Sequence, residues 1–178
     1  MNLKRIFPLL LIIFILFYTK NINVEENLIP DDAIRFRVIA NSNTVYDQNI
    51  KIQIRNEVQN KIFELTKDSN TIEETREILK SNISFINNVV ENKLKELSYD
   101  KSFSINYGLN PFPEKKYKGV KYKAGDYESL VITLGEGTGD NWWCVLFPPL
   151  CLIESEDESL SSEVEYKSYI KEIINKYF

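Results

Sequence analysis

Both cysteines and both tryptophans of this 178-residue chain fall in one short segment, and there is no histidine. Without histidine the chain has no Ser-His-Asp triad, Cys-His pair or HExxH zinc site. Acid–base chemistry would therefore depend on carboxylates. Glu136 and Asp140 are the candidates, because a carboxylate pair beside Trp142-Trp143 resembles what a glycosidase uses on cell-wall sugar. A carbohydrate-binding or carbohydrate-cleaving envelope enzyme is the alternative function, although acidic residues in a glycine-rich turn are usually solvated.

The uncharged segment 141–152 contains Cys144 and Cys151 on either side of Pro148-Pro149. In an exported protein such a cysteine pair oxidises, and the disulfide closes a loop of about eight residues if the Cα atoms approach within about 7 Å. Two cysteines without histidine form no closed zinc site, and their spacing is not that of a CxxC oxidoreductase. We predict a disulfide, no metal and no cofactor, while a redox or metal role stays as a minor alternative.

Two arrangements of segment 141–152 remain open. The favoured one is a core strand followed by an outward-facing loop, because prolines cannot donate hydrogen bonds to a sheet. A disulfide-closed apolar loop would then present rigid side chains at small entropic cost, as binding hot spots require. The other arrangement buries the whole segment. The favoured arrangement, with an outward-facing loop, predicts that a partner is bound by Asn141, Trp142, Trp143, Phe147, Pro148, Pro149 and Leu150.

Arg35 and Arg37 share the non-core face of the first predicted strand. They are a second candidate contact for a partner. The favoured alternative is a solvated face, or one whose arginines pair with nearby carboxylates.

Charge and glycine spacing disfavour several ligand classes. The chain carries 22 basic and 26 acidic residues, a net charge of −4. An acidic domain lacks the basic face that nucleic acid or anionic lipid requires. Gly135, Gly137 and Gly139 form a GxGxG motif, but a phosphate-binding loop runs directly into a helix, and Trp142-Trp143 is a poor helix start. We therefore predict neither nucleic-acid nor nucleotide binding.

The chain begins like an exported protein. Lys4 and Arg5 precede an uncharged run over residues 6–18, the layout of an export signal. As a helix this run is about 20 Å long, short of the roughly 30 Å hydrocarbon core, which favours a signal peptide. No small-x-small cleavage site follows, so an uncleaved signal anchor remains open, and only then would the protein stay in the membrane. In either case the basic residues direct the remainder across the membrane.

Hydrophobic periodicity predicts the elements of the exported part. Period-two alternation over 34–40 indicates a strand, and apolar spacings of three and four indicate helices over 50–65 and 71–97. Further predictions are a strand over 103–107, a loop at 110–113, a hairpin around 124–126 and a C-terminal helix over about 162–177. The fold class is α+β, with a mainly antiparallel sheet packed against two long helices plus the C-terminal helix. The domains are a signal peptide or anchor (1–24), a tether (25–32) and one signalling domain (33–178).

Two blocks of sequence resemble the stage II sporulation protein R family of endospore-forming bacteria. One is IPDDAIRFRVIANS at 29–42 with Asp47-Gln48 close behind. The other is GDYESLVITLG at 125–135, which runs into NWWCVLFPPLC at 141–151. The resemblance extends from about Ile29 to Leu152.

This resemblance implies an intercellular signal and not a catalyst. The protein would be made in the forespore and exported into the space between the septal membranes. Its partner would be a membrane-embedded aspartic protease of the mother cell, which then cleaves the pro-form of sigma-E. A structural component of the envelope is the third class. The resemblance assigns no contact residues, so the predicted partner-binding residues come from physical argument alone.

Overall fold

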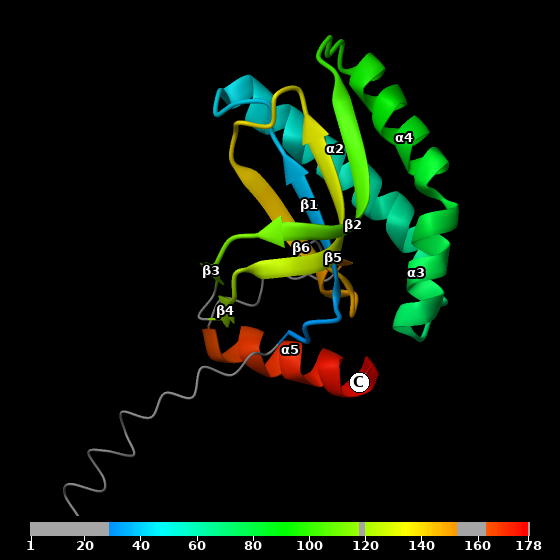
Figure 1. The fold of residues 1–178 in the computed structure, drawn as a ribbon, viewed down its shortest axis with the longest axis vertical. Coiled ribbons are helices and arrows are strands. Elements are labelled where there is room, and N and C mark those ends of the chain that lie inside the picture. Colours follow the sequence, from blue (N-terminus) through cyan, green and yellow to red (C-terminus); the bar gives the residue numbers. More distant parts are fainter. Residues whose placement is uncertain (1–28, 118–119, 153–162, 178) are drawn as a thin grey trace, which may run out of the picture.

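The fold is built around a mixed four-stranded sheet (Figure 1). A computed structural model describes residues 29–117, 120–152 and 163–177. The strand order is β2-β5-β1-β6, with β1 at Ile34–Ile39, β2 at Phe103–Phe112, β5 at Gly125–Leu134 and β6 at Asn141–Phe147. β1 is parallel to β5 and antiparallel to β6, and β2 is antiparallel to β5. The predicted α+β class is confirmed, but the sheet is mixed. After the helices the chain enters the outer strand β2 and then returns as β5, which lies between β2 and β1 and runs parallel to β1.

Three helices cover one face of the sheet. They are α2 (Val45–Thr66), α3 (Ile72–Ser81) and α4 (Ile83–Glu96). One continuous helix over 71–97 was predicted, but the chain leaves the helical conformation at Asn82, with φ −107° and ψ 12°. The Asn82 side chain donates to the carbonyl oxygen of Ile78 at 2.8 Å, the kind of local bond with which asparagine competes against helix continuation. The prediction of a single long helix over 71–97 is therefore wrong.

The main core lies between these helices and the sheet. The predicted core face of β1 is confirmed, since Ile34, Phe36 and Val38 are fully buried. Apolar residues of the three helices pack against it, namely Ile50, Ile54, Val58, Ile62, Ile72, Leu79, Ile86, Val90 and Leu94. Helices with a single apolar stripe obtain most of their stability from such packing.

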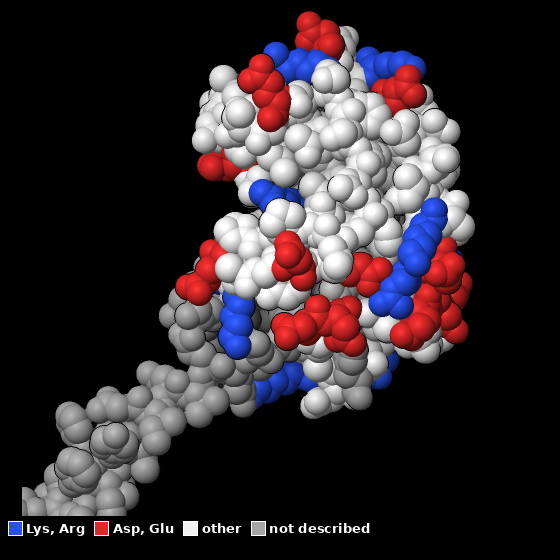
Figure 2. Space-filling view, viewed as in Figure 1, with Lys and Arg blue, Asp and Glu red and all other residues white. Residues whose placement is uncertain are grey.

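The opposite face of the sheet is covered by smaller elements. A two-stranded hairpin joins β3 (Lys115–Tyr117) to β4 (Val120–Tyr122), and α5 (Glu163–Tyr177) lies at the foot of the sheet (Figure 1). A second cluster of buried apolar residues forms there from Ile29, Ala33, Val145, Leu150 and Ile170. In the view of Figure 2, charged side chains lie at the top edge and over the lower half of the domain, and the area between them is mainly uncharged.

Two predictions about the chain after β2 were wrong. The predicted loop at 110–113 is largely strand, because Pro111 pairs with Asp126 in register. β2 is an edge strand, where a proline can face away from the sheet without losing a ladder bond. The residues at 124–126 do not form a hairpin turn. They lead into β5, and the hairpin joins β3 and β4 instead.

The predicted export signal (1–24) lies outside the described residues, as does the first half of the predicted tether. Among the described helices, none has the length and apolar character needed to cross a bilayer.

Candidate functional site

The two predicted arginine contacts lie among aromatic rings on the face of the sheet opposite α2. Arg35 is only 3% exposed, and its Cζ lies 3.3 Å from the centroid of the Tyr127 ring. Arg37 is half-buried, with its Cζ 5.5 Å from the Phe112 centroid, and its Nη1 donates to the carbonyl oxygen of Pro111 at 3.1 Å. Neither an exposed contact nor a solvated face therefore describes Arg35. Cation–π contact takes the place of solvent.

The Arg35 guanidinium is incompletely hydrogen-bonded. Within the described part of the chain, its Nε and Nη1 and the Nε of Arg37 are buried without a hydrogen-bond partner. Burial lowers the pKa of Arg35, and nearby tyrosine and aspartate groups oppose that shift. A buried cation held mainly by ring faces is costly.

The predicted disulfide is present between Cys144 and Cys151, whose Cα atoms are 5.4 Å apart. Cys144 lies in β6, and Cys151 lies in the short 3-10 helix η1 (Leu150–Leu152). The Cys151 Sγ is 2.9 Å from the carbonyl oxygen of Val145. Gln59 of α2 donates to the Cys151 carbonyl at 2.7 Å. The disulfide loop, residues 144–151, is thus folded back against β6.

The prediction of an outward-facing apolar loop is wrong. Phe147 is 2% exposed and Leu150 is 7% exposed, and Pro148 is also buried. Phe147 meets the ring of Tyr177 edge-on, with centroids 5.2 Å apart. Leu150 belongs to the core cluster that contains Ile170 of α5. The apolar side of α5 needs a partner, and the loop supplies it.

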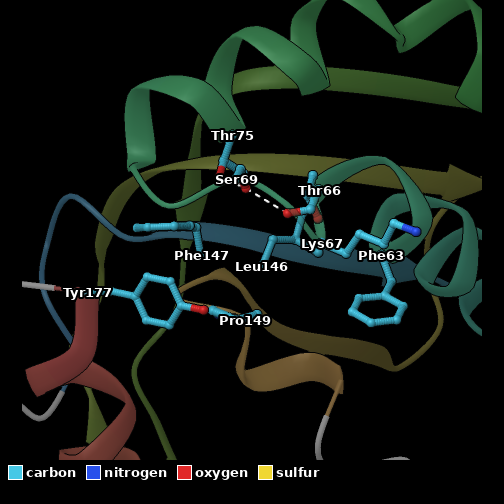
Figure 3. A pocket seen from close by; sticks show the side chains of 9 residues that line it. All are labelled: Phe63, Thr66, Lys67, Ser69, Thr75, Leu146, Phe147, Pro149 and Tyr177. Atoms are coloured by element: carbon cyan, nitrogen blue, oxygen red, sulfur yellow. Dashed lines mark hydrogen bonds between the residues drawn. The ribbon is translucent and has the colours of Figure 1, made fainter.

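A small cavity lies beside this loop (Figure 3). Its volume is about 80 Å³, and it is lined by Phe63, Thr66, Lys67, Ser69, Thr75, Leu146, Phe147, Pro149 and Tyr177. The Ser69 hydroxyl donates to the Thr66 carbonyl at 2.7 Å and lies 2.9 Å from the Thr75 hydroxyl. A few water molecules fit in such a space, whereas ligand sites are typically several hundred cubic ångströms.

The tryptophans remain partly accessible and point to opposite faces of β6. Trp142 packs on Phe36 and lies 4.9 Å beneath the Arg55 guanidinium. Trp143 packs on Phe112, with the Lys115 ammonium 4.8 Å from its ring centroid. Asn141, at the start of the strand, is also half-exposed. Of the predicted partner-binding set, Asn141, Trp142, Trp143, Pro149 and Arg37 thus keep some surface.

The glycine-rich turn at 135–140 is hydrogen-bonded to the loop at 40–43. Gly139 donates its amide to the Ala40 carbonyl at 2.9 Å, and the Asp140 amide donates to Asn43 Oδ1 at 2.6 Å. The Glu136 amide donates to Asn41 Oδ1 at 3.1 Å. A Cβ on Gly139 would collide with the backbone of Ser42. The glycines permit close approach of two chain segments, while the Glu136 and Asp140 side chains are exposed.

Asp47 organises the loop at 41–44, a role that the sequence patterns did not predict. This carboxylate is 4% exposed and accepts hydrogen bonds from Ser42 Oγ at 2.5 Å, Asn41 Nδ2 at 2.8 Å and Tyr99 Oη at 3.2 Å. The bond from Ser42 is the main cause of the lowered pKa of Asp47. A sequence signal existed, because Asp47 precedes Ile50 by three residues and so lies on the buried stripe of α2.

A metal centre is not suggested by the side chains in view. No group of three histidine, cysteine, aspartate or glutamate residues within 29–117, 120–152 and 163–177 could hold an ion.

Comparison with known proteins identifies the family. The family model for stage II sporulation protein R matches residues 30–157. The chain belongs to the stage II sporulation protein R family. A curated relative, stage II sporulation protein R from Bacillus subtilis (strain 168), is 39% identical over 149 residues, which cover 84% of this chain and 66% of the relative. This chain therefore spans about two thirds of that relative's length.

The matched region runs from the approach to β1 past the disulfide loop. It includes both arginines, the glycine-rich turn and both cysteines, whereas α5 lies beyond it. No solved structure matches the chain. The family predicted from the two sequence blocks is confirmed, and it supports a role in sporulation.

Proposed function

We propose that this member of the stage II sporulation protein R family is an exported intercellular signal. It activates a membrane-embedded aspartic protease of the mother cell, which then processes the pro-form of sigma-E. Family membership over residues 30–157 carries the proposal. The curated relative supports a sporulation role by its name.

A binding role accords with how the side chains are used. The buried carboxylate Asp47 is fully engaged in holding a loop. Glu136 and Asp140, the candidate carboxylates of the glycosidase alternative, lie on a surface turn, and neither lines the small cavity beside the disulfide loop. The positions of these carboxylates therefore favour partner recognition over hydrolysis as the role of the domain.

Export from the forespore into the space between the septal membranes is part of the proposal. The disulfide supports it, because structural disulfides persist in oxidising compartments outside the cytoplasm. The N-terminal export signal remains a prediction from the sequence.

The burial of several predicted residues supports a smaller proposed contact on β6 and the neighbouring β1. Phe147, Pro148 and Leu150 are buried, and Arg35 is buried too. Asn141, Trp142 and Trp143 are half-exposed on one strand, with Arg37 on the neighbouring strand. We place the contact with the protease on these four residues.

Co-expression tests this function in a host that does not sporulate. The chain, the protease and the sigma-E pro-form are produced together, and pro-form cleavage is followed by immunoblot. Cleavage that requires all three proteins is the expected result. Absence of cleavage with an exported, disulfide-bonded chain overturns the proposal. If the purified chain instead digests peptidoglycan and Glu136→Gln stops digestion, the enzyme alternative replaces it.

A further inference from the structure

The two edges of the sheet differ in how they are protected. An exposed edge strand presents unpaired backbone groups, and proteins usually block it. At the β2 edge, Pro111 interrupts the row of amide donors. β6 forms the other edge and, among the described residues, pairs only with β1. Its sequence from Asn141 to Phe147 contains neither proline nor charge.

The disulfide loop blocks only the second half of the β6 edge. The Cys151 Sγ lies 2.9 Å from the carbonyl oxygen of Val145. The Val145 carbonyl therefore points away from β1 and toward η1. Residues 145–147 are buried, whereas residues 141–144 are all half-exposed. The open part of the edge is therefore Asn141–Cys144.

Strand geometry shows which backbone groups this open part offers. Along a strand, the amide and carbonyl of alternate residues point to opposite edges. Since the Val145 carbonyl points outward, those of Trp143 and Asn141 do so as well. The Ala40 carbonyl fits this phase, because it accepts from the Gly139 amide and so faces β6. Along β1 the carbonyls of Val38 and Phe36 then face β6 as well, opposite Trp142 and Cys144. Two residues thus offer up to four hydrogen bonds to a neighbouring strand.

Positive charges lie on both sides of the open edge. The Arg55 guanidinium lies over Trp142 on the α2 side, and the Lys115 ammonium lies over Trp143 on the hairpin side. The buried Lys51 ammonium reaches the Asp140 carbonyl at 3.1 Å near the start of the strand. Asp140 is the one acidic residue that directly adjoins the strand in the sequence. An acidic strand is therefore the electrostatically favoured neighbour.

We propose that residues 141–144 of β6 accept an extended acidic segment of the partner as an added strand, with Trp142 and Trp143 packing on its two faces. Main-chain hydrogen bonds supply affinity in this mode, and alternate side chains supply specificity. The inference rests on the proposed function, because it specifies how the partner is held.

A peptide titration tests the proposal on the isotopically labelled full-length chain with its disulfide formed. The probe is an acetylated and amidated hexapeptide, Thr-Glu-Val-Glu-Val-Thr, added to about 1 mM. We expect amide shifts centred on Asn141 and Trp143. A peptide with lysine in place of glutamate should bind about tenfold more weakly, and so should the acidic peptide N-methylated at alternate amides. No shift at these amides, or equal binding by the N-methylated peptide, overturns the proposal.

Matched variants separate backbone recognition from side-chain recognition. Trp143→Ala and Trp143→Pro both remove the indole, but only the proline removes the outward amide. We expect binding to weaken in the alanine variant and to vanish in the proline variant. Equal binding by the two variants contradicts an added strand. If the proline variant fails to fold, the N-methylated peptide decides.

A charge test and the co-expression assay complete the design. Arg55→Glu with Lys115→Glu should reverse the preference toward the lysine peptide, and an unchanged preference contradicts the proposed charge match. If the peptide binds as expected while co-expression gives no pro-form cleavage, the function fails and the binding mode stands. If cleavage persists in Trp143→Pro, the binding mode fails and the function stands.

Discussion

The guanidinium carbon of Arg35 lies 3.3 Å from the centroid of the Tyr127 ring. The two residues come from the adjacent parallel strands β1 and β5, so the contact is built into the centre of the sheet. Phe112 of β2 lies 5.7 Å from the same guanidinium carbon. A cation thus fills a position where a sheet covered on both faces would usually place an apolar side chain.

Replacement of this cation by an apolar side chain should be tolerated. We expect Arg35→Met to leave the free energy of unfolding within about 1 kcal/mol of the wild type, because a chain of similar length keeps the ring contacts without a buried charge. Arg35→Glu should lower the free energy of unfolding by about 3 kcal/mol, because a buried carboxylate would lie against the negative faces of the aromatic rings. Urea denaturation measures both. A loss above about 2 kcal/mol in Arg35→Met would indicate that the charge has a strong partner.

The disulfide should stabilise the domain and protect the β6 edge. Cys144→Ala with Cys151→Ala should lower the free energy of unfolding by about 2.5 kcal/mol on the chain-entropy estimate for a loop of about eight residues. The loosened loop should also uncover the second half of β6 and promote self-association. Denaturation and light scattering measure the two effects. A variant that is as stable and as monomeric as the wild type contradicts both roles.

Local patterns in the sequence predicted the secondary-structure elements better than they predicted which residues contact each other in the fold. The alternation of Ile34, Phe36 and Val38 identified both the first strand and its buried face. The same alternation could not reveal that Arg35 on the other face is covered by Tyr127 and Phe112. Those residues are distant in sequence, and the pairing of β5 with both β1 and β2 brings them together.

The disulfide loop shows the same limit at the candidate site. Oxidation of Cys144 with Cys151 followed from compartment and spacing. Whether Phe147 and Leu150 faced outward depended on α5, whose apolar side packs on them from beyond the matched region. A long-range contact of this kind leaves no trace in the spacing of the loop itself.

Close approach at Gly139 should make this position intolerant of a side chain. Gly139→Ala would drive a Cβ into the backbone of Ser42, and we expect a loss of about 2 kcal/mol in the free energy of unfolding. Glu136→Ala in the same turn is the matched control, because its side chain is exposed and its amide bond to Asn41 is retained. That control should change stability by less than about 0.5 kcal/mol. Equal effects of the two substitutions would show that the turn does not depend on close packing.

Acid sensitivity should trace in large part to Asp47. Hydrogen bonds, chiefly from Ser42, lower the folded-state pKa of Asp47. A depressed carboxyl pKa stabilises the fold above the unfolded-state value of about 4, and that stability is lost as pH falls through the folded-state pKa. Glu128 adds to the loss with the same sign. Burial raises its pKa, but hydrogen bonds from Arg76 and Tyr107 outweigh that effect.

Asp47→Asn should therefore change the pH profile as well as the stability. At neutral pH we expect the free energy of unfolding to fall by about 2 kcal/mol, because the amide is a weaker acceptor for the three side chains that bind Asp47. Below about pH 4 the variant should lose stability less steeply than the wild type, with Glu128 accounting for the remaining slope. Urea denaturation across this range measures both. Parallel curves for variant and wild type would show that Asp47 titrates alike in the folded and unfolded chain, so its hydrogen bonds would not favour the ionised carboxylate.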